Sequence, residues 1–109
     1  MVQLSGVRKD NITHLPILED FQKHFFITAG RLRYPVVVGI NIKNFKYFNQ
    51  TCGFENGNLL LERMADHFCF SNPDCRLASR IYGDHMIVLA EAYTPDEIVI
   101  QEEFLIMCR

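Results

Sequence analysis

Apolar and polar positions along this chain recur with periods that predict its elements in turn. Near the N-terminus, apolar residues fall at i, i+3, i+7 and i+11 with charged residues between them, which is the spacing of one helix face. The apolar residues of this face are Leu18, Phe21, Phe25 and Ala29. Pro16 suits the first turn of this helix, and Gly30 suits its C-terminal cap.

A nearly continuous apolar run, YPVVVGINI, follows over residues 34–42 and includes three consecutive valines. Such a run predicts a buried strand rather than an edge strand. Residues 44–57 predict a short helix and then a loop that contains Gly53 and Gly57. A second long helix is predicted at about residues 56–70, where apolar residues again form a stripe.

Two further strands are predicted at about residues 75–82 and 85–92, on either side of a Gly83-Asp84 turn. A two-residue loop with glycine between apolar runs is the signal of a β-hairpin. A last helix is predicted from Thr94, where Thr-Pro-Asp-Glu forms a capping box with proline at the first helical position. The apolar side of this helix is supplied by Ile98, Phe104, Leu105 and Cys108.

The order of these elements predicts an α/β (α+β) fold in a single domain over residues 1–109. Because two helices separate the first strand from the hairpin, the first strand cannot simply form a hairpin with the second. We therefore expect a mixed sheet of parallel and antiparallel pairs with helices on at least one face. Residues 36–42 are expected to form its central strand, flanked by the hairpin strands.

Composition and charge exclude some classes of function. The 109 residues carry a formal net charge of −2, whereas a nucleic-acid binder that neutralises phosphates needs a clear basic excess. The longest apolar run, residues 86–90, is too short to cross a membrane. Residues 1–11 lack the apolar core of a signal peptide. We therefore expect a cytoplasmic protein with no nucleic-acid partner and no membrane segment within this chain.

Four short motifs, in this order, resemble the GGDEF family, the diguanylate cyclase domain of bacterial signalling. DNITHLP at residues 10–16 is similar to the family's D-x-L-T-G-L-P, and NIKNFKYFN at residues 41–49 is similar to its D-I-D-x-F-K-x-I-N. Glycines and leucines within residues 53–61 fall near its G-H-x-x-G-D-x-x-L-L, and RIYGDHM at residues 80–86 stands where it has R-x-G-G-D-E-F. The signature hairpin thus comprises Arg80, Tyr82, Gly83, Asp84, His85 and Met86.

The resemblance implies a palm-like fold, as in nucleotidyl cyclases and polymerases, and an activity that joins two GTP molecules into cyclic di-GMP. Family members hold two divalent metal ions between a carboxylate at the end of the first strand and one in the hairpin. Carried over residue by residue, the metal positions fall on Asn41, the backbone of Ile42 and Asp84. The catalytic acidic position falls on His85, and Lys43 stands at the second acidic position of the strand.

These substitutions weaken the metal site that the resemblance implies. Mg²⁺ prefers anionic oxygen ligands, whereas Asn41 offers a neutral oxygen and Lys43 places a cation nearby. The imidazole of His85 prefers softer metals, so only Asp84 retains the usual ligand chemistry. We therefore expect no resident cofactor, with Mg²⁺ bound only together with GTP.

The substrate-binding positions of the family fall on Asn49, which is retained, on Asn58, which replaces an aspartate, and on Lys46, at the position of a phosphate contact. A carboxylate accepts both the N1–H and the N2–H of guanine, whereas an amide offers one acceptor and one donor. A mismatched donor in a buried site costs about 1–3 kcal/mol. Guanine binding is therefore expected to be weakened at Asn58.

A purely structural role is open for the same residues. Asn41 suits a helix cap, and Asp84 suits a Gly-Asp turn. Lys46 suits a solvated surface, and Asn49 suits hydrogen bonds to loop backbone. Arg80 would then pair with an acid such as Asp84 across the turn rather than with a ligand.

These residues favour a degenerate GGDEF domain of cyclic di-GMP signalling that lacks cyclase activity and serves as a regulatory or interaction module with weak GTP binding. The alternative is an active diguanylate cyclase that uses the substituted ligands, and a third class is a scaffold without a ligand. The resemblance implies three partners: GTP, a neighbouring phosphodiesterase or sensor domain, and a second copy of the chain. Family domains continue further, so we expect an excised piece or a shortened domain.

Overall fold

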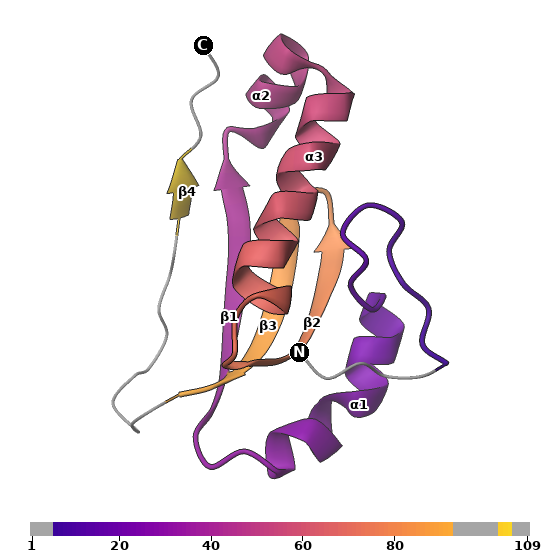
Figure 1. The fold of residues 1–109 in the computed structure, drawn as a ribbon, viewed down its shortest axis with the longest axis vertical. Coiled ribbons are helices and arrows are strands. Elements are labelled where there is room, and N and C mark those ends of the chain that lie inside the picture. The colour runs from indigo at the N-terminus through magenta and orange to yellow at the C-terminus, as the bar shows by residue number, and fades with distance from the viewer. Residues whose placement is uncertain (1–5, 93–102, 106–109) are drawn as a thin grey trace.

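The computed structural model of the chain describes residues 6–92 and 103–105 (Figure 1). Within them, α-helices cover Leu18–Gly30 (α1), Phe45–Cys52 (α2) and Phe54–Ala65 (α3), and a π-helical turn, η1, extends α3 over Asp66–Phe70. The strands cover Pro35–Lys43 (β1), Cys75–Tyr82 (β2), His85–Glu91 (β3) and Glu103–Leu105 (β4). The predicted mixture of helices and strands is therefore confirmed.

The four strands form one sheet in the order β2-β3-β1-β4. Strands β2 and β3 are the predicted hairpin, which turns at Gly83 with φ 52°. Strand β3 pairs antiparallel with β1, with Val38 opposite Val88, whereas β4 pairs parallel with β1. The predicted mixed sheet with a central first strand is confirmed. The hairpin strands do not flank β1, however, because both lie on one side of it and β4 lies on the other.

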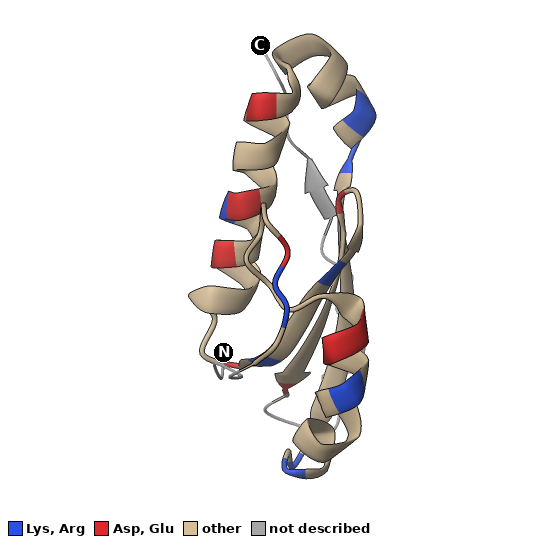
Figure 2. Ribbon diagram, turned by 90° about the vertical axis from the view of Figure 1, so that its right-hand side faces the viewer, with Lys and Arg blue, Asp and Glu red and all other residues tan. Residues whose placement is uncertain are grey.

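Two apolar clusters fill the two faces of the sheet. On one face, α3 packs against β1 and the hairpin through Leu61, Met64, Ile40, Met86 and Val88. On the other face, α1 packs against the hairpin through Phe21, Leu77 and Leu89. Helices α1 and α3 therefore lie on opposite sides of the sheet, as Figure 2 shows.

Burial alternates along β1. Ile40 and Ile42 are buried under α3, whereas Val37 is 42% exposed on the opposite face. The cluster beneath α1 is built from α1, the segment after it and the hairpin strands, so α1 covers the hairpin rather than β1. The prediction of a buried strand is therefore correct for one face of β1 and wrong for the other. The valine run reflects β-propensity as well as burial.

The segment after β1 is more helical than its sequence predicts. Only Gly53, at φ 87°, separates α2 from α3, so Gly57 lies inside α3 and not in a loop. A single glycine suffices here because it adopts a left-handed backbone that other residues rarely reach. The predicted helix cap at Asn41 is also wrong, because α2 begins at Phe45 with Asn44 as its N-cap.

The predicted start of the first helix is wrong, and so is part of the last predicted helix. Helix α1 begins at Leu18, and Pro16 precedes it in a β-bridge with Lys9. The last predicted helix is contradicted at residues 103–105, where pairing with β1 gives strand β4, while residues 94–102 lie outside the described part. None of the helices in the described residues is long and apolar enough to cross a membrane.

Candidate functional site

The tip of the hairpin reaches the C-terminal end of β1. There the backbone N–H of Ile42 donates a hydrogen bond of 2.7 Å to Oδ2 of Asp84. Asn41, the preceding residue, is exposed on β1, and the side chain of Asp84 is 16% exposed. The three positions predicted as metal ligands thus lie together at one end of the sheet, because the register of β1 and β3 aligns the strand end with the turn.

His85 occupies the position that the family resemblance predicts for the catalytic acid. Its Nε2 lies 3.9 Å from Oδ1 of Asp84, and its ring lies 4.6 Å from the ring of Tyr82 at an interplanar angle of 32°. The side chain is 41% exposed, so protons can exchange with solvent. A protonated imidazole here adds positive charge beside Asp84, whereas a carboxylate would add negative charge.

The donors at this end of the sheet do not fit a pair of Mg²⁺ ions. Asp84 brings a single carboxylate, and one of its oxygens already accepts the N–H of Ile42. Lys43, two residues beyond Asn41, brings a cation. Across residues 6–92 and 103–105, no three His, Cys, Asp or Glu side chains are grouped so that they could hold a metal ion. No catalytic step through a metal ion follows from this arrangement.

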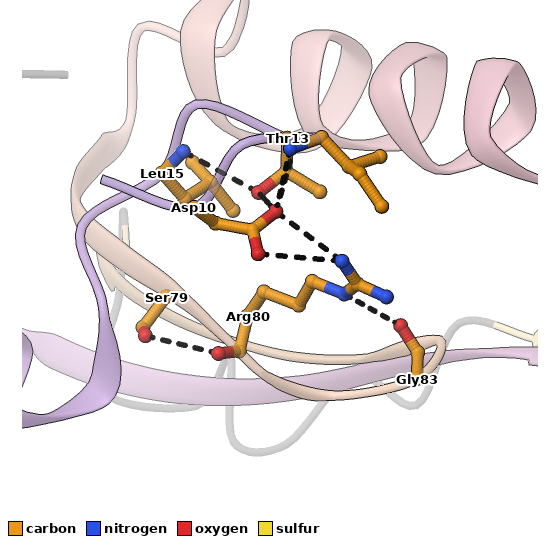
Figure 3. Close-up of polar contacts among 7 residues, drawn as sticks. Asp10, Thr13, Leu15, Ser79, Arg80 and Gly83 are labelled. Atoms are coloured by element: carbon orange, nitrogen blue, oxygen red, sulfur yellow. Dashed lines mark hydrogen bonds and ion pairs between the residues drawn. The ribbon is translucent and has the colours of Figure 1, made fainter.

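Arg80 links the hairpin to a turn near the N-terminus (Figure 3). Its Nη1 lies 3.3 Å from both carboxylate oxygens of Asp10, and its Nε donates a hydrogen bond of 2.8 Å to the carbonyl oxygen of Gly83. The sequence predicts an acid such as Asp84, across the turn, as a partner of Arg80. That pairing is wrong, because the partner is Asp10, which lies 70 residues away along the chain.

Asp10 also organises its own turn. Its Oδ2 accepts hydrogen bonds from the backbone N–H of Thr13 at 2.8 Å, from the Thr13 hydroxyl at 2.9 Å and from the backbone N–H of Ile12 at 3.2 Å. Burial raises the pKa of Asp10, but the Thr13 hydrogen bonds, the Arg80 charge and the Ile12 hydrogen bond together outweigh burial. The pKa of Asp10 therefore lies below its usual value.

Asp10 and Thr13 are structural residues of this site that were not predicted from the sequence. Their spacing is typical of an Asx turn, in which a short acidic side chain accepts backbone N–H groups two and three residues later. That signal could have predicted the turn. It could not have predicted the ion pair with Arg80, because nothing local specifies a partner so distant in sequence.

Asn49 lies in α2 with its side-chain amide against Gly57 of α3. Its Oδ1 is sealed from water and makes no hydrogen bond. The predicted structural role of Asn49, hydrogen bonding to loop backbone, is therefore not fulfilled by its side-chain oxygen. Its predicted role toward guanine stays a prediction.

Lys46 and Asn58 are both exposed. Asn58 lines a cleft of about 380 Å³ between α3 and the N-terminal turn, together with Ile12 and His14. Asn49 does not line this cleft. The two predicted guanine contacts are thus not brought into one described cleft, and the phosphate role of Lys46 stays a prediction. Figure 2 shows acidic residues at intervals along α3 and η1, and two of them, Glu55 and Glu62, line this cleft.

A family model described as "Diguanylate cyclase, GGDEF domain" matches residues 7–106. The chain belongs to the GGDEF family. The match includes the turn at Asp10, the end of β1 and the hairpin, which are the parts that carry the resemblance. The family assignment is therefore confirmed, and with it a connection to cyclic di-GMP signalling.

Two solved structures are similar to this GGDEF chain. One is the GGDEF domain of TpbB (YfiN) from Pseudomonas aeruginosa, with a TM-score of 0.68 and 24% identity. The other is a sensory box/GGDEF family protein from Caulobacter crescentus, with a TM-score of 0.64 and 26% identity. Each match covers 80% of this chain, and this chain spans 54% and 60% of the two matched chains, respectively. Comparison with curated protein sequences gives no match.

Proposed function

We propose that this chain is a GGDEF domain without cyclase activity, which serves cyclic di-GMP signalling as a regulatory or interaction module and binds GTP weakly. The observation that carries the proposal is the 2.7 Å hydrogen bond between Asp84 and the backbone of Ile42. A carboxylate oxygen engaged with β1 has less capacity for a cation, and Asn41 and Lys43 bring no negative charge to compensate. Weak rather than tight GTP binding follows from the loss of metal-bridged triphosphate contacts.

An active diguanylate cyclase that uses the substituted ligands is the alternative. One observation favours it: the imidazole of His85 lies 3.9 Å from Asp84. An imidazole beside a carboxylate is a common pair in general acid–base catalysis. Proton transfer alone does not hold a triphosphate, however, and the scarcity of carboxylates at this site is why we prefer the inactive domain.

The proposal includes a setting for the domain. We place it in the cytoplasm, beside a sensor or phosphodiesterase domain of the same protein and paired with a second copy of itself. Support for the neighbouring domain comes from the Caulobacter crescentus structure, whose name joins a sensory box to the GGDEF family.

The proposal predicts that the chain makes no cyclic di-GMP from GTP with either Mg²⁺ or Mn²⁺. The physical reason is that Asn41, Lys43 and His85 replace the acidic groups that would hold two ions. Chromatography of the reaction mixture after prolonged incubation measures the product, with an established diguanylate cyclase as the positive control. Product above the no-protein background that disappears in Asp84→Ala would establish the active alternative instead.

A further inference from the structure

The amide of Asn49 fills the place where any other residue at position 57 would have a side chain. A Cβ built on Gly57 would lie 1.8 Å from Oδ1 of Asn49 and 2.9 Å from its Cγ. Real carbon atoms do not approach other heavy atoms so closely without displacement. Asn49 comes from α2 and Gly57 from α3, so the two helices meet through this pair of residues.

Gly57 has no backbone reason to be glycine. It is buried inside α3, and its φ lies outside the left-handed region that requires glycine. Glycine within a helix is unfavourable relative to alanine, because its backbone loses more freedom on folding. A steric reason remains, since the space over Gly57 is occupied by the amide of Asn49.

No hydrogen bond holds the oxygen of this amide. Oδ1 of Asn49 is one of two sealed side-chain atoms without a hydrogen-bond partner among the described residues, and the other is Oε2 of Glu91. The second oxygen of Glu91 does accept hydrogen bonds, from the backbone N–H groups of Arg33 and Tyr34. Because no donor holds this sealed oxygen, its position depends on the space that Gly57 leaves for it.

We propose that Gly57 is a positioning residue that seats the amide of Asn49 by leaving it room. This inference rests on the proposed GTP binding in one respect, namely that the seated amide contacts the guanine base. Gly57 acts through Asn49 and does not touch the ligand. Displacing the amide therefore weakens binding of GTP without changing binding of a nucleotide whose base lacks the guanine hydrogen-bonding edge, such as ATP.

A stability cycle tests the seating without any nucleotide. The four proteins are wild type, Gly57→Ala, Asn49→Ala and the double variant, compared by their urea midpoints. In the Asn49→Ala background, Gly57→Ala should raise the midpoint, because helix propensity improves and the amide is gone. In the wild-type background, the same change should give no such rise, because the new methyl group collides with the amide. Gly30→Ala, at the open end of α1, is the matched control and should behave alike in both backgrounds.

A binding experiment tests the consequence for guanine. GTP and ATP are titrated into each ¹⁵N-labelled protein, and dissociation constants are taken from amide chemical shifts, which remain measurable for weak ligands. Gly57→Ala should weaken GTP binding about tenfold, the effect of losing one hydrogen bond, and leave ATP binding unchanged. The side-chain NH₂ resonances of Asn49 should shift in Gly57→Ala even before nucleotide is added.

The outcomes separate this inference from the proposed function. An equal rise of the midpoint in both backgrounds overturns the seating of Asn49, whether or not GTP binds. Coupling means that Gly57→Ala raises the midpoint only in the Asn49→Ala background. Coupling together with no GTP binding by wild type supports the seating of Asn49 and overturns the proposed GTP binding. Coupling together with equal GTP affinity in wild type and Gly57→Ala overturns the positioning role toward guanine.

Discussion

Returning carboxylates to positions 41, 43 and 58 should increase the affinity for GTP in the presence of Mg²⁺ by as much as about two to four decades. Asn41→Asp and Lys43→Asp add negative charge at the end of β1 beside Asp84. Asn58→Asp restores an acceptor pair for the guanine edge. A regained metal contact and a regained base contact are each worth about 1–3 kcal/mol, and every 1.4 kcal/mol is about tenfold in affinity. Isothermal titration of GTP with and without Mg²⁺ measures the gain.

The controls for this experiment divide the gain into two parts. Asn41→Asp with Lys43→Asp should improve binding only when Mg²⁺ is present, whereas Asn58→Asp alone should act equally with and without it. Adding Asp84→Asn to the triple variant should remove the Mg²⁺-dependent part. Unchanged weak binding by the triple variant would show that the altered ligands are not what the site lacks. Tight, Mg²⁺-dependent binding of GTP by the unmodified chain would contradict the expectation that its metal site is weakened.

Asp10→Ala should lower the free energy of unfolding by about 2–3 kcal/mol at neutral pH. The substitution removes the acceptor of three hydrogen bonds from Ile12 and Thr13. It also leaves Arg80, whose side chain is 17% exposed, without its carboxylate partner. Hydrogen bonds to a charged group are worth about 1.5–3 kcal/mol, and the solvent that reaches this pair moderates the total. Urea denaturation measures the loss, and Glu55→Ala on the exposed surface of α3 is a matched acidic control expected to change little.

The contribution of Asp10 should also depend on pH with a defined sign. Its pKa in the folded chain lies below the ordinary value of 3.8, so folding favours the charged carboxylate. That stabilisation is fully present above the ordinary value and is lost as pH falls through the lower pKa of the folded state. The difference in stability between wild type and Asp10→Asn should therefore be constant near neutral pH and shrink on acidification below about pH 4. A difference that grows on acidification would contradict this account of the Asp10 turn.

How much the sequence predicts depends on the distance over which each interaction acts. The placement of Asn41 and Asp84 at the same end of the sheet was predictable, because a strand end and a hairpin turn are local patterns and the family resemblance implies that they lie together. The ion pair between Asp10 and Arg80 was not predictable, because 70 residues separate the two side chains. Each of them could pair with many other charged residues of the chain. Strand β4 was not predicted, because the local spacing of apolar residues suited a helix. Its strand conformation comes with parallel pairing to β1, which is distant in sequence. The burial of β1 was overestimated. Helix α1 covers the hairpin strands rather than β1, and the valine run does not indicate where α1 packs.

The contact between Asp84 and Ile42 extends the sheet by a side chain. The last residue pair of β1 and β3 is Ile40 opposite Met86, so the N–H of Ile42 lies beyond the antiparallel ladder, and Asp84 serves as its next rung. A cation bound by Oδ2 of Asp84 would share that oxygen with this N–H, because each carboxylate oxygen has two lone pairs. Any cation contact at Asp84 and the hydrogen bond at the end of β1 therefore depend on the same carboxylate, three residues before α2 begins at Phe45.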